Sequence, residues 1–127
     1  MFVRSACLVA LVGAGCAGAS VTQRSPTGPL PEGPPVVTLG GAGATPTILH
    51  IYSREQATFV NDDSRSHEIV NDRALSEDPG CDGVAVGVLE PRESRKAAVL
   101  PNGIACYYRD ARDPGNVAFK GIVLMHY

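Results

Sequence analysis

The sequence contains little that would bind nucleic acid or cross a membrane. Its 127 residues carry 11 Lys and Arg against 13 Asp and Glu, a formal net charge of −2. The basic residues form no cluster, whereas binding to nucleic acid needs clustered Lys and Arg to displace counterions. Outside a short apolar run over residues 6–15, no stretch approaches the roughly 20 apolar residues that cross a bilayer. We therefore expect no nucleic-acid partner and no membrane-spanning segment.

Arrangements typical of catalytic sites are also absent. Ser66, His67 and Asp110 could be taken for a triad, but Ser66 and His67 are adjacent and would point to opposite faces of a strand. The Gly-rich run over residues 40–43 lacks the Lys and the Ser or Thr of a phosphate-binding loop. The sequence therefore predicts no catalytic residue and no enzyme activity.

The N-terminus has the pattern of an export signal. Arg4 supplies a positive charge before the apolar run, which is too short to span a bilayer. Residues 13–16, Gly-Ala-Gly-Cys, resemble a bacterial lipobox, in which Cys16 would be diacylated and become the mature N-terminus. Gly13 stands where Leu or Val is usual, so ordinary signal-peptide cleavage near residues 17–19 is the alternative. We expect a periplasmic or surface lipoprotein of the bacterial cell envelope, anchored to the membrane through Cys16, or otherwise a secreted protein.

The rest of the chain divides into a linker and one domain. Residues 17–35 are rich in Ser, Thr, Gly and Pro, a composition that cannot build a core and that predicts a tether. Residues 36–127 contain short apolar runs separated by turns, and no segment keeps a 3.6-residue period. About seven short strands at this spacing predict an all-β fold, an antiparallel Greek-key sandwich. Asn102-Gly103 predicts a hairpin turn.

The four cysteines have separate expected roles. Cys7 would leave with the leader and Cys16 is the expected lipid site, so Cys81 and Cys106 would remain in an oxidising compartment. A pair of cysteines there most economically forms a disulfide. As a free thiolate, Cys106 would instead be available to a metal ion. The two roles of Cys106 exclude each other.

Two stretches about forty residues apart carry a recognisable pattern. Phe59-Val60-Asn61 leads through a polar loop to Ser66-His67-Glu68-Ile69, and Cys106 precedes a closing strand that contains Gly121-Ile122-Val123. Cys81, residues 89–94, Tyr108 and Asp110 also fit the pattern. Together these residues resemble the cupredoxins, the single-domain β-sandwich family of plastocyanin and azurin. The resemblance implies a cupredoxin fold, with copper ligands at the positions of His67 and Cys106.

One expected ligand is missing from this pattern. Arg109 stands where the resemblance places a second copper histidine, and His50 and His126 do not fit the family's ligand positions. A blue copper site needs two imidazoles and a thiolate. A guanidinium offers no lone pair and would place a positive charge beside the ion. We therefore expect a degenerate copper site without a cofactor, in which Arg109 either pairs with Asp110 or Glu68 or is an exposed loop residue.

Two hypotheses follow for the function. The leading one is an exported, lipid-anchored, cupredoxin-like domain that acts as a binding or structural module, with an unidentified protein partner in the cell envelope. The alternative is a copper-binding protein for electron transfer or copper trafficking, which would use His67 and Cys106 with a carboxylate such as Glu68 or Asp110.

Overall fold

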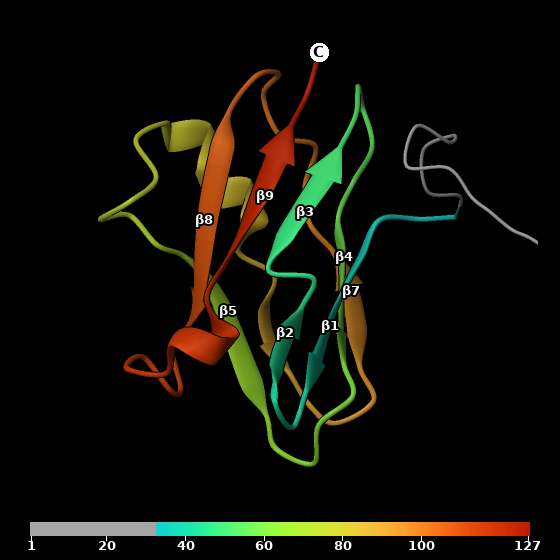
Figure 1. Ribbon diagram of the computed structural model, residues 1–127, viewed down its shortest axis with the longest axis vertical. Helices are drawn as coiled ribbons and strands as arrows, with labels where there is room; N and C mark the ends of the chain where they lie inside the picture. Colours follow the sequence, from blue (N-terminus) through green and yellow to red (C-terminus); the bar gives the residue numbers. More distant parts are fainter. Residues whose placement is uncertain (1–32) are drawn as a thin grey trace, which may run out of the picture. The chain divides into compact units, whose positions relative to one another are not determined.

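The computed structural model describes residues 33–127, which form a sandwich of two β-sheets (Figure 1). The predicted leader, Cys16 and most of the predicted linker lie outside these residues. One sheet has the strand order β2-β1-β4-β7 and the other has the order β3-β9-β8-β5-β6. The strands are β1 (Val36–Gly40), β2 (Gly43–Thr45), β3 (Ile48–Ile51), β4 (Thr58–Asn61), β5 (His67–Asn71), β6 (Gly87–Leu89), β7 (Ser94–Lys96), β8 (Ala105–Asp110) and β9 (Gly121–Met125). Within residues 33–127 no helix has the length and apolar character needed to cross a membrane.

The predicted all-β sandwich is confirmed, with two differences in its strands. The described residues form nine strands rather than about seven, and two neighbouring pairs, β1 with β4 and β3 with β9, are parallel. Parallel neighbours arise because the chain between their strands passes through the opposite sheet. Asn102-Gly103 does form a turn, but it joins β7 of one sheet to β8 of the other. It is therefore not the hairpin turn that the dipeptide predicted.

The strand β2 begins at a glycine with a positive φ. Gly43 has a φ of 136°, and a Cβ atom there would lie 2.5 Å from the carbonyl oxygen of Ala118. Ala118 belongs to a short 3₁₀ helix, η4 (Val117–Phe119), which precedes β9. The missing side chain at Gly43 thus lets η4 pack directly on β2.

Alternation along the strands decides which side chains enter the core. In β8, Cys106, Tyr108 and Asp110 are buried, whereas Tyr107 and Arg109 lie on the outer face of the sheet. Phe59 of the opposite sheet meets Tyr108 edge to face, with ring centroids 5.0 Å apart. The side chain of Phe59 is fully buried.

A disulfide joins Cys106 to Cys81, whose Cα atoms are 5.2 Å apart. Cys81 lies in a second 3₁₀ helix, η3 (Pro79–Val84), which begins where the side chain of Asp78 accepts a hydrogen bond from the N–H of Gly80. Both cysteines are fully buried. The disulfide closes the loop between Cys81 and Cys106, which contributes roughly 3–4 kcal/mol to stability in the chain-entropy account. It also fixes η3 against β8.

Candidate functional site

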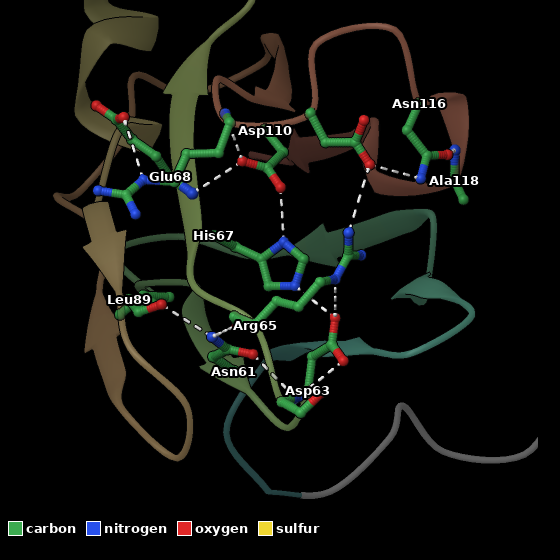
Figure 2. A network of polar contacts seen from close by, with 12 residues as sticks. Asn61, Asp63, Arg65, His67, Glu68, Leu89, Asp110, Asn116 and Ala118 are labelled. Atoms are coloured by element: carbon green, nitrogen blue, oxygen red, sulfur yellow. Dashed lines mark hydrogen bonds and ion pairs between the residues drawn. The ribbon is translucent and has the colours of Figure 1, made fainter.

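A single buried histidine lies where β5 begins, close to the end of β8. His67 is 1% exposed, and its ring lies between two carboxylates (Figure 2). Its Nδ1 is 2.6 Å from Oδ2 of Asp110, and its Nε2 is 2.8 Å from Oδ2 of Asp63. This carboxylate–imidazole–carboxylate group, which we call the His67 network, is the most connected polar arrangement of the buried interior.

The two aspartates reach His67 by different routes. Asp110 is the last residue of β8, and the register places it opposite Ile69, two residues along β5 from His67 on the same face. Asp63 lies in the loop between β4 and β5. That loop is shaped by buried Asn61, which accepts a hydrogen bond from the N–H of Asp63 and donates to the carbonyls of Arg65 and Leu89. Asn61, the last residue of the Phe-x-Asn motif, therefore positions one half of the network.

The hydrogen-bond geometry of His67 requires a charged ring. A neutral imidazole has one N–H donor, whereas both nitrogens of His67 face carboxylate oxygens, which only accept. Both contacts are hydrogen bonds when each nitrogen carries a proton. Arg65 adds a second cation, with Nε 3.3 Å from Oδ2 of Asp63. The Arg65 side chain is half exposed and also lies 3.9 Å from Asp113, so it meets Asp63 from the surface side of the network.

The surroundings favour the ionised form of both aspartates. Burial raises the pKa of Asp110, but the N–H of Glu68, the ring of His67, the N–H of Arg112 and the charge of His67 outweigh it, so this pKa lies below its ordinary value. The pKa of Asp63 is also lowered, first by the hydrogen bond from His67 and then by that from the N–H of Ser64. Burial raises the pKa of Asp63, whereas the hydrogen bond and the charge of Arg65 lower it further.

An aromatic ring packs against the imidazole. Phe119, at the end of η4, has its ring centroid 4.4 Å from that of His67, and the guanidinium of Arg65 lies 5.6 Å from the Phe119 centroid. The side chain of Asn116 begins η4 by accepting a hydrogen bond from the N–H of Ala118. Asn116 in turn donates to Asp113, so polar contacts order the whole connection between β8 and β9.

The structure does not bring His67 and Cys106 together. Cys106 lies four residues before Asp110 in β8, which corresponds to about 13 Å along a strand. Its sulfur is bonded to Cys81. The residue that faces His67 from β8 is Asp110.

Arg109 does not enter the His67 network. It pairs with Val70 in the register of β5 and β8, and its side chain lies on the outer face of the sheet. Among residues 33–127 it takes part in no ion pair, and the arginine nearest Glu68 is Arg112, at 4.0 Å. Arg109 therefore pairs with neither Asp110 nor Glu68, because adjacent residues of a strand face opposite sides. Asp110 pairs with His67 instead.

The sequence analysis did not assign Asp63, Arg65 or Phe119 to the site. The alternation of side chains along the strand could have indicated Asp110. If Tyr108 packs in the core, then alternation places Asp110 on the same face, next to the closing loop. The positions of Asp63 and Arg65 depend on the loop that Asn61 organises, and nothing in their spacing indicates that geometry.

The donor atoms around His67 do not fit a copper ion. A blue copper centre needs two imidazoles and a thiolate, whereas here both nitrogens of one imidazole are bonded to carboxylates. Within residues 33–127, no three side chains of His, Cys, Asp or Glu are arranged to share a metal ion.

Comparison with known proteins identifies the fold. No family model and no curated protein sequence matches the chain. Solved structures do match: the M98A mutant of amicyanin in its Cu(I) form has a TM-score of 0.54 at 14% identity, covering 76% of this chain and 86% of that one. A purple cupredoxin from Nitrosopumilus maritimus has a TM-score of 0.53 at 19% identity, covering 72% and 98%. The chain has a cupredoxin fold.

A larger copper protein contains a similar domain. The copper-containing nitrite reductase of Thermus scotoductus SA-01 has a TM-score of 0.60 at 19% identity, and the match covers 83% of this chain but 25% of that one. The structural similarity establishes a shared cupredoxin fold. At identities this low, the chemistry depends on the residues of each site.

The His67 network predicts a specific loss of stability in acid. Because the folded pKa of Asp110 is lowered, its contribution is complete above the unfolded value of about 3.9 and is lost as the pH falls through the folded value. Asp110→Asn should cost about 3–5 kcal/mol at pH 7, since it leaves part of a buried ion pair uncompensated. It should also flatten the loss of stability in acid. The measurement is the melting temperature of both proteins from neutral pH into acid.

The matched control is Asp62→Asn. Asp62 is an exposed neighbour of Asp63 that pairs only with Arg92 at the surface. This variant should follow the wild-type curve, because exposed ion pairs contribute about 0–1 kcal/mol. Parallel wild-type and Asp110→Asn curves would contradict the assignment.

Proposed function

We propose that this chain is an exported, lipid-anchored cupredoxin-like module with a binding or structural role, and that its ancestral copper position is closed by side chains. The observation that carries the proposal is the pair of carboxylate bonds to His67. An imidazole that donates from both nitrogens has no lone pair to offer a metal ion.

Copper binding at His67 would require the network to be taken apart. The ring would have to lose a proton and at least one carboxylate bond, and the abandoned carboxylate would remain buried. Breaking a buried ion pair costs about 3–5 kcal/mol, which corresponds to a loss of roughly 10²- to 10⁴-fold in affinity. These costs favour a His67 network that excludes copper over one that holds copper loosely.

We assign no catalytic role to the His67 network. A substrate would have to reach an imidazole that is 1% exposed and that packs against Phe119. The network instead ties the loop between β4 and β5 to the end of β8, which is the work of a structural element. A rigid sandwich held on a tether suits a module that presents its surface to a protein partner in the cell envelope.

The lipid anchor in this proposal rests on the sequence pattern at Cys16. We expect the mature protein from a membrane fraction to begin at a diacylated Cys16, and mass spectrometry of its N-terminal peptide measures this directly. The Cys16→Ser variant should lose the lipid mass and leave the membrane fraction. An unmodified N-terminus at residues 17–19 in the wild-type protein would contradict the anchor.

The copper-protein alternative is tested by colour and by thiol content. Cu²⁺ is added to the full chain carrying Cys7→Ser and Cys16→Ser, and the visible spectrum is recorded. We expect no intense thiolate-to-copper charge-transfer band, and no thiol that reacts before reduction. A blue protein would contradict the closed position.

A third substitution separates two reasons for the missing colour. Adding Cys81→Ser frees Cys106, which lies about 13 Å along β8 from Asp110. We expect this variant to remain without the band, because the distance and the His67 network are unchanged. A band that appears only in this variant would mean that the disulfide, and not the network, excludes copper.

A further inference from the structure

Two histidines meet on the outer face of the five-stranded sheet, far from His67. Nδ1 of His50 and Nε2 of His126 are 2.8 Å apart, and their ring centroids are 5.1 Å apart with an angle of 20° between the planes. His50 is exposed and His126 is half-buried. The two rings are separated by 76 positions in the sequence, and the fold alone brings them together.

The parallel pairing of β3 with β9 creates this pair. His50 lies opposite Leu124, and His126 follows two residues later on the same face. The N–H of His126 donates to the carbonyl of Ile51, which continues the pairing beyond the last residue of β9. Tyr52 stacks on the His126 ring with centroids 4.8 Å apart. The backbone and one aromatic neighbour thus hold His126 beside His50.

We propose that His50 and His126 together bind a divalent transition-metal ion, with Cu²⁺ bound most tightly. Neutral imidazole nitrogen is a preferred ligand of Cu²⁺, Ni²⁺ and Zn²⁺, and affinity at such sites peaks at Cu²⁺. Adjacent ligands at about 2.0 Å in a tetragonal complex have their nitrogens about 2.8 Å apart. The observed separation already matches that spacing.

Binding requires a small change in the rings and no change in the sheet. In the metal-free pair one ring donates its N–H to the other, and in the complex that proton moves to the far nitrogen of the same ring, so that both facing nitrogens offer a lone pair to the ion. His50 is exposed, and its ring reorients without disturbing the core. Among residues 33–127 no carboxylate or thiol completes a three-residue metal group, so water fills the remaining positions. Such a site binds an ion reversibly and leaves it open to exchange.

The His50–His126 pair is distinct from the His67 network. Register places Tyr108 opposite Gly121, so Asp110 and His67 lie at one end of the sheet and His126 lies at the other. In Figure 1 the C-terminus, next to His126, is at the top of the view, whereas the helical turn before β9 is near the bottom. The inference does not depend on the proposed function and would survive its failure.

The first test follows the ring protons of all three histidines by NMR. The protein is the full chain carrying Cys7→Ser and Cys16→Ser, so that neither thiol competes for the metal. Substoichiometric Cu²⁺ should broaden the ring signals of His50 and His126 first and leave those of His67 sharp. Broadening of neither surface histidine, or of one alone, would overturn the paired site.

The second test measures affinity by calorimetry in the same background. Either His50→Ala or His126→Ala should weaken Cu²⁺ binding at least about tenfold, because the second imidazole otherwise binds at high effective concentration. Ser53→Ala, in the exposed turn after β3, is the matched control and should bind as the parent does. Equal affinity in parent and histidine variants would overturn the proposal, and unchanged melting temperatures would show that the variants are folded.

The two copper experiments can be told apart. Occupation of the surface pair gives weak absorption and broadened His50 and His126 signals, since nitrogen and water are its ligands. Copper at the His67 position would instead broaden the ring signals of His67, which is flanked by Asp63 and Asp110. One result therefore supports this inference, and the other contradicts the closed position described under the proposed function.

Discussion

One buried imidazolium, paired with two carboxylates, ties the loop before β5 and the start of β5 to the end of β8. Asp63 comes from the loop before β5, His67 begins β5, and Asp110 ends β8. Each charge lies in a region that is closed to water, so each is stable only while the others are present. Phe119 packs against the His67 ring, and Arg65 contacts Asp63 from the surface side. Removing either aspartate would leave one nitrogen of the buried His67 ring without its partner.

This arrangement shows how a sandwich can keep its architecture while its site changes chemistry. The start of β5 and the end of β8 lie side by side because of strand register, whatever side chains they carry. In this chain they bring an imidazole to a carboxylate. The copper proteins that match this chain have identities of 14–19% to it, so the fold is what the structures share.

The sequence predicted the strands better than it predicted their partners. The short apolar runs separated by turns predicted an all-β sandwich, and the described residues form one. The parallel pairs were not predicted, because they depend on connections that cross between sheets. The sequence also did not indicate that Asp110, rather than Arg109, enters the site. Residues next to each other in a strand face opposite sides, and the packing of Tyr108 and the Cys81–Cys106 bond decide which one points inward.

The central claim, a doubly protonated His67 held between two carboxylates, is tested most directly by NMR correlation of its ring protons with both ring nitrogens at neutral pH. The account predicts that Nδ1 and Nε2 of His67 each carry a proton, with both N–H protons protected from exchange by burial. It also predicts that neither signal moves when Cu²⁺ is added. A bare nitrogen on the His67 ring, or a shift of its signals with copper, would contradict the account.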